Sequence, residues 1–166
     1  MKLALIGLGN MGQAILDGIL NNNILNKDQI TAADKKFSNS EFELPEKYRG
    51  IDITDDNKEA AAKADYIILA VKPQIIKAVL DEIKTAAHSK VIISIAAGIK
   101  TELLQDYFGT DAKIIRVMPN TPALVAEAMS ALYYSPSVEA DERAFVEKIF
   151  NSFGEAVEVS EKDMDA

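Results

Sequence analysis

The first twenty residues restrict the fold of this chain more than any other feature of the sequence. They read MKLALIGLGNMGQAILDGIL, so that the apolar run from Leu3 to Ile6 leads directly into Gly7, Gly9 and Gly12. Apolar residues then recur at the three- and four-residue spacing of a helix. A buried strand, a glycine-rich turn and an amphipathic helix in this order form the first unit of a parallel α/β fold.

Each of the three glycines has a separate physical reason. Gly7 allows a tight turn where the strand ends, Gly9 lets a pyrophosphate approach a backbone without a Cβ, and Gly12 lets the helix pack closely on the strand. The N–H groups and partial positive charge at the helix N-terminus also favour a pyrophosphate. The pattern alone is weak, because a glycine-rich turn without a ligand has the same form. Asp34, which ends the next apolar run about 20 residues later, completes the dinucleotide-binding fingerprint.

Short apolar runs alternate with amphipathic stretches along the rest of the chain. Strands are expected at LALIG, ITAAD, IDIT, DYIILA, KVIISI, AKIIRVMP, MSALYYS and EAVEVS, and residues 37–50 are expected to form an irregular connection. Alternation of this kind predicts an α/β protein with a Rossmann-like, doubly wound and mostly parallel sheet that carries helices on both faces. The length suits one domain that spans residues 1–166.

Composition excludes several classes of function. The formal net charge of -8 argues against binding nucleic acid, since that binding depends on neutralising phosphates. No apolar run approaches the roughly 20 residues of a membrane span. The chain has no cysteine, and its single histidine, His88, lies in a polar segment, so we predict no metal site. A cytoplasmic location is expected.

The residues after the second strand leave the choice between NAD and NADP open. The Asp34 carboxylate can accept hydrogen bonds from both ribose hydroxyls of NAD, and it repels a 2′-phosphate. Lys35, Lys36 and Ser38 follow at once, and they can hold that phosphate or form a solvated charged loop. We expect NADP or NAD as the cofactor, with a slight preference for NADPH.

Six motifs together resemble the pyrroline-5-carboxylate reductases. They fall in order over nearly the whole chain and read IGLGNMGQAI, DNKEA, ADYIILAVKPQ, ISIAAGI, RVMPNTPALV and FGEAVEVSEKDMDA. RVMPNTP and AVKPQ are far more specific than the glycine pattern. The departures are Gly12, where the family often has alanine, and VAEAMSAL, which replaces a glycine-richer segment. The resemblance implies proline biosynthesis, in which 1-pyrroline-5-carboxylate is reduced to L-proline by hydride transfer from NAD(P)H.

The resemblance also implies which residues contact the cofactor, and they fall in four groups. The pyrophosphate would be lined by Ile6, Gly7, Leu8, Gly9, Asn10 and Met11, in a loop completed by Gly12. The adenosine ribose would lie near Asn57. The fourth strand would run along the cofactor at Ala70, Val71, Lys72 and Pro73. The nicotinamide would be bordered by Ile95, Ala96 and Ala97, with the loop Met118–Pro122, including Pro119 and Asn120, at the reaction centre.

No catalytic residue is predicted, because we find neither a proton donor nor a cluster that would bind the substrate carboxylate. Asn120 offers an uncharged donor and acceptor, although capping a turn would explain it equally simply. In the family, a helical domain follows the segment that ends here at Ala166. That domain forms a homodimer or higher homo-oligomer and completes the substrate site. Residues 1–166 are therefore expected to bind cofactor without reductase activity. The alternatives are a related imine or 2-hydroxy-acid reductase domain and a non-catalytic nucleotide-binding module.

Overall fold

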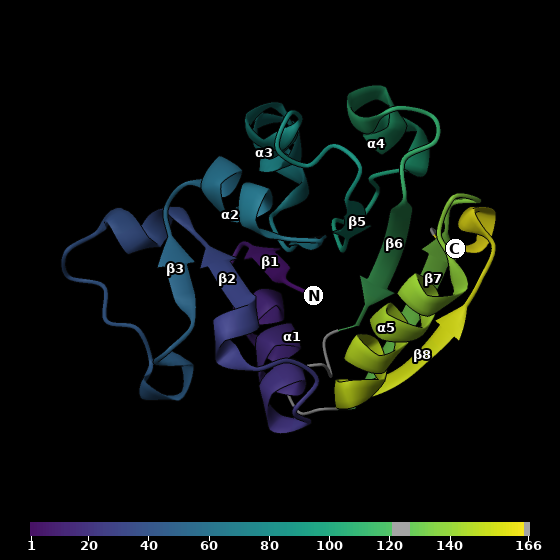
Figure 1. Ribbon diagram of the computed structural model, residues 1–166. Coiled ribbons are helices and arrows are strands. Elements are labelled where there is room, and N and C mark those ends of the chain that lie inside the picture. Colours follow the sequence, from purple (N-terminus) through teal and green to yellow (C-terminus); the bar gives the residue numbers. More distant parts are fainter. Residues whose placement is uncertain (121–126, 165–166) are drawn as a thin grey trace.

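A single eight-stranded sheet organises the chain (Figure 1). The computed structural model describes residues 1–120 and 127–164. The strands are β1 (Leu3–Ile6), β2 (Ile30–Ala33), β3 (Asp52–Thr54), β4 (Tyr66–Leu69), β5 (Val91–Ser94), β6 (Ile114–Pro119), β7 (Ala128–Tyr134) and β8 (Gly154–Glu158). Their order in the sheet is β3-β2-β1-β4-β5-β6-β7-β8, and only the β6–β7 pair among these is antiparallel. The predicted mostly parallel sheet is thus confirmed.

Helices cover both faces of the sheet. The α-helices are α1 (Asn10–Asn21), α2 (Asn57–Lys63), α3 (Ile76–Ile83), α4 (Thr101–Phe108) and α5 (Ala140–Phe150). Short 3-10 helices occupy Lys27–Gln29, Lys35–Ser38, Glu46–Tyr48, Pro73–Ile75, Asn151–Phe153 and Glu161–Asp163. Between residues 37 and 50 the chain contains only such short turns, so the irregular connection is also as predicted.

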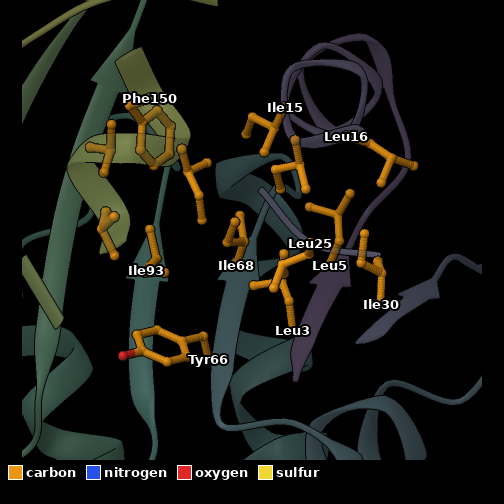
Figure 2. Close-up of a cluster of buried hydrophobic side chains, with 14 of the residues drawn as sticks. Leu3, Leu5, Ile15, Leu16, Leu25, Ile30, Tyr66, Ile68, Ile93 and Phe150 are labelled. Atoms are coloured by element: carbon orange, nitrogen blue, oxygen red, sulfur yellow. The ribbon is translucent and has the colours of Figure 1, made fainter. Parts of the chain in front are cut away.

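The two layers of the core follow from the alternation of side chains along the strands. In β1, Leu3 and Leu5 pack in the layer beneath α1 and α5, and Ala4 and Ile6 pack in the layer beneath α2, α3 and α4. Figure 2 shows the first layer, in which side chains from α1 and from Phe150 of α5 meet those of the central strands. Because both faces are buried, the central strands are apolar at every position.

The topology indicates at which edge of the sheet a ligand would bind. The carboxyl ends of β1 to β6 all lie at this edge, because these strands are parallel to their neighbours. The chain leaves β1 for one neighbour, β2, and returns on the other side as β4. Ligands of open α/β sheets bind outside the carboxyl ends at such a reversal of strand order.

Candidate nucleotide-binding site

Gly7 and Gly12 are required by the fold of the loop between β1 and α1. Gly7 has a φ of +97°, and a Cβ there would lie 2.5 Å from the Ala70 carbonyl oxygen. A Cβ at Gly12 would overlap the Gly7 carbonyl, where α1 packs against the loop. Both glycines therefore have the steric roles predicted for them.

Gly9 differs from these two glycines, because its missing side chain faces open space. A Cβ at Gly9 would meet no atom within 4 Å, and the residue has an ordinary extended backbone. It caps α1, and no side chain accepts a hydrogen bond from this helix end. The first turn of α1 holds no acidic residue. An exposed, uncapped helix N-terminus with open space above a glycine fits a pyrophosphate.

Asp34 holds the glycine loop in place. Its Oδ2 accepts a 2.7 Å hydrogen bond from the Leu8 N–H, and its Oδ1 accepts one of 3.0 Å from the Lys36 N–H. The Lys36 ammonium donates to the Leu8 carbonyl and lies 3.9 Å from Asp34 Oδ2. Sequence reasoning assigned Asp34 to the cofactor ribose and did not find the contacts of Asp34 and Lys36 with Leu8, which join residues 26 and 28 positions apart.

A cleft of about 280 Å³ lies beside this loop, at the carboxyl ends of β1, β2 and β4. It is lined by Gly7, Ala33, Asp34, Lys35, Asn57, Val71, Ile75, Ala78, Val79 and Glu82. Pockets for drug-sized ligands measure about 300 to 1,000 Å³. The cleft therefore has the size for one end of a dinucleotide, and five of the predicted cofactor residues border it, namely Gly7, Asp34, Lys35, Asn57 and Val71.

Sequence reasoning missed the wall of the cleft that α3 and the residue before it provide. Ile75, which precedes α3, and Ala78, Val79 and Glu82 of α3 lie at the spacing of one helical stripe. The signal is present in the segment QIIKAVLDEI, but its stronger apolar stripe of Ile76, Val79, Leu80 and Ile83 packs into the core. Only the position of α3 against α2 and the sheet shows that a second stripe faces a ligand-sized space.

The residues predicted along the nicotinamide lie farther along the same edge. Ala70 to Pro73 follow β4, Ile95 to Ala97 follow β5, and Met118 and Pro119 end β6. Of these, Lys72, Pro73 and Ala97 are exposed, and Ala96 is buried. Of these predicted nicotinamide residues, each within the described ranges, Val71 is the one that borders the cleft of about 280 Å³.

Asn120 connects β6 to β7. Its N–H donates to the Met129 carbonyl at 3.2 Å, and its Oδ1 accepts from the Met129 N–H at 3.0 Å. This is the capping role that the sequence left open for Asn120. Thr121 and Pro122 of the predicted loop lie outside the described residues.

A partly buried ion pair joins β6 to the 3-10 helix Glu161–Asp163. Arg116 is 3% exposed, and its Nη1 lies 2.9 Å from Glu161 Oε1. Glu161 Oε1 also accepts a 2.8 Å hydrogen bond from the Thr101 N–H at the start of α4. Burial raises the pKa of Glu161, but the bonds from Thr101 and Arg116 outweigh it and hold that pKa below its ordinary value.

Other functional classes find little support in the described residues. Within 1–120 and 127–164, no three His, Cys, Asp or Glu side chains gather to hold a metal ion. Among the same described residues, no helix has the length and apolar character needed to cross a membrane. His88 is exposed, and its ring nitrogen pairs with the neighbouring Ser89 hydroxyl at 3.3 Å.

Comparison with known proteins connects this site to a family of reductases. Residues 2–98 match the family described as NADP oxidoreductase coenzyme F420-dependent. The chain is 33% identical to the pyrroline-5-carboxylate reductase of Arabidopsis thaliana over 166 residues, which cover 99% of this chain and 59% of that protein. The resemblance inferred from the sequence motifs is therefore confirmed over nearly the whole chain.

Solved structures agree with this result. Pyrroline carboxylate reductase of Plasmodium falciparum, crystallised with NADP bound, is 36% identical and superimposes with a TM-score of 0.86 over 99% of this chain and 60% of that one. A pyrroline-5-carboxylate reductase from Coxiella burnetii is 31% identical, with a TM-score of 0.88 over the same shares. The chain spans about 60% of the length of the relatives it matches.

Proposed function

The chain belongs to the family described as NADP oxidoreductase coenzyme F420-dependent, and from this premise we propose that it is the nucleotide-binding domain of a pyrroline-5-carboxylate reductase. Its cofactor is NADP or NAD. The observation that carries the proposal is the open space above Gly9 at the uncapped N-terminus of α1. The identity of 33% to 36% with named reductases and the NADP bound to one of them support it.

The residues of this chain bind and orient the cofactor. Backbone N–H groups at the start of α1 hold the pyrophosphate, and Asp34 with Lys36 keeps the loop from moving when the ligand binds. The adenosine enters the cleft between α2 and α3, and the nicotinamide extends toward the ends of β5 and β6. When bound, the reduced cofactor supplies the hydride that converts a cyclic C=N bond to an amine.

Substrate binding requires further groups in this proposal. Hydride transfer needs the imine carbon within about 3 to 3.5 Å of the nicotinamide and a group that anchors the substrate carboxylate. At the ends of β5 and β6 the described residues are mainly alanine, glycine, isoleucine, methionine and proline, and none of these carries a charge. A helical domain beyond residue 166 would supply the anchor and form the homodimer. A cytoplasmic location stays a prediction.

Titration calorimetry tests the central step. Purified chain titrated with NADPH, and separately with NADH, should show one binding site per chain. No heat change with either dinucleotide at millimolar concentration would contradict the proposed function. A longer form that continues into the natural downstream sequence should also oxidise NADPH in the presence of pyrroline-5-carboxylate.

A further inference from the structure

We propose, on the basis of the function proposed above, that Glu82 makes the cleft selective for adenine by accepting a hydrogen bond from the exocyclic amine of the base. Besides Asp34 at the glycine loop, the lining of the cleft combines an apolar wall with the Glu82 carboxylate on α3. An adenine ring has two flat apolar faces and an amine on one edge, and this arrangement matches both.

The wall explains why apolar side chains at the start of α3 remain uncovered. Ile75, the residue just before α3, is 50% exposed although it is large and apolar, and Ala78 of α3, next to it in the stripe, is also exposed. Ala33 and Val71, from the ends of β2 and β4, line the same space. A flat ring placed there would cover this apolar surface, which favours a base over a sugar or a phosphate.

The Glu82 carboxylate is fixed at the end of this wall. Its Oε2 accepts a 2.7 Å hydrogen bond from Asn57 Nδ2, and the Asn57 side chain belongs to a residue that is only 5% exposed. The Lys35 ammonium lies 3.8 Å from the same oxygen, which is an ion pair but too long for a hydrogen bond. Lys35 therefore does not take up the capacity of the Glu82 carboxylate to accept hydrogen bonds.

An ionised carboxylate has a simple chemical preference. It accepts hydrogen bonds and donates none, so it attracts an amine and repels a carbonyl oxygen. Adenine carries an amine at the position where hypoxanthine and guanine carry oxygen. Glu82 is 42% exposed at its side chain, so the contact is partly screened by water, and we expect a moderate selectivity.

The experiment compares NADPH with nicotinamide hypoxanthine dinucleotide phosphate, in which oxygen replaces the adenine amine. The chain should bind NADPH about tenfold more tightly, which is the effect of losing one hydrogen bond to a charged group in a partly exposed site. In Glu82→Gln the ratio should fall to one or below, because the amide NH2 that faces the base when the amide oxygen accepts from Asn57 can donate to the hypoxanthine oxygen but cannot accept from the adenine amine. This variant keeps an oxygen for Asn57. Glu82→Ala should also lose the preference.

Asp81→Asn is the matched control. Asp81 neighbours Glu82 on α3, but its carboxylate is exposed and pairs with Lys84 at 3.6 Å. This control should keep the tenfold ratio. Equal affinity of the unmodified chain for the two dinucleotides would overturn the role of Glu82 while the proposed function stands. A preference that persists in both Glu82 variants would overturn it as well. Failure to bind either dinucleotide would overturn the proposed function and this inference together.

Discussion

The two ends of the proposed cofactor site are built differently, although both lie on the same edge of one sheet. At the adenosine end, residues from β1, β2, α2 and α3 surround a cleft of about 280 Å³, and polar side chains there are fixed by hydrogen bonds. At the nicotinamide end, Lys72, Ala97 and Asn120 are exposed. In the proposed function, the sheet and its own helices suffice for nucleotide recognition, while the reaction needs groups from elsewhere.

The largest expected effect concerns activity. Residues 1–166 should bind NADPH but reduce pyrroline-5-carboxylate at less than about a thousandth of the rate of a form that includes the downstream sequence, because positioning of the two reactants contributes several orders of magnitude. Loss of NADPH absorbance measures this directly. Comparable rates for the two forms would show that the nicotinamide end is complete, and the residues from Met118 to Asn120 would be the first to test.

Gly9→Val should abolish most nucleotide binding at the glycine loop without unfolding the protein. The new side chain enters open space in this structure, and the backbone at Gly9 is extended, so the melting temperature should stay nearly unchanged. It occupies the position of the pyrophosphate, and we expect affinity for NADPH to fall about 100-fold or more, equivalent to about 2.8 kcal/mol. Calorimetry measures this loss. Thr110→Val, an exposed site away from the glycine loop, is the control, and equal NADPH binding by Gly9→Val and the unmodified chain would refute the placement.

Glu161→Gln should lower the stability of the fold. Near neutral pH the free energy of unfolding should fall by about 1 to 3 kcal/mol, since the Arg116 pair is lost in a mostly buried setting. The pKa of Glu161 is lowered in the folded state, so its stabilisation is present above the ordinary value of 4.5 and disappears as the pH falls through the folded-state pKa. Urea unfolding should therefore show the difference shrinking in acid. The exposed Glu155→Gln is the control, and a difference independent of pH would contradict the account.

The smallest effect concerns the choice of cofactor. Lys35 and Lys36 have different surroundings in the structure. The Lys35 side chain is 69% exposed at the rim of the cleft, whereas the Lys36 ammonium donates a hydrogen bond to the Leu8 carbonyl. Lys35→Ala should weaken NADPH binding a few-fold more than NADH binding, as only NADPH carries the 2′-phosphate. Lys36→Ala should weaken both alike. Equal losses of the two cofactors in Lys35→Ala would mean that Lys35 is simply solvated.

Local patterns in the sequence were enough to predict most of the fold. The apolar runs around Leu5 and Ile68 predicted central strands, and the structure has both. The conformation of Gly7 and the packing at Gly12 followed from the spacing of the glycines alone. These features depend on neighbours within a few residues, which is why periodicity and glycine content are sufficient to find them.

Contacts between distant segments could not be predicted in the same way. Glu161 meets Arg116 across 45 positions, and Glu82 meets Asn57 across 25. In the sequence, a charged residue on an amphipathic helix gives the same pattern whether its side chain faces water or a cleft. The sequence likewise did not indicate that β7 runs antiparallel to β6 and that β8 runs parallel to β7, since the residues of a strand do not determine in which orientation it pairs.

The sequence by itself thus determined the strand–glycine–helix unit, the alternation of strands and helices and the family resemblance, because each is carried by residues close together along the chain. Only the tertiary structure decided that Asp34 and Lys36 hold the loop through Leu8 and that Glu82 lies at the end of the apolar wall of the cleft. It also showed Asn120 as the cap between β6 and β7. Each of these roles depends on which distant backbone or side chain lies within hydrogen-bond distance, and the packing of helices on the sheet sets that distance.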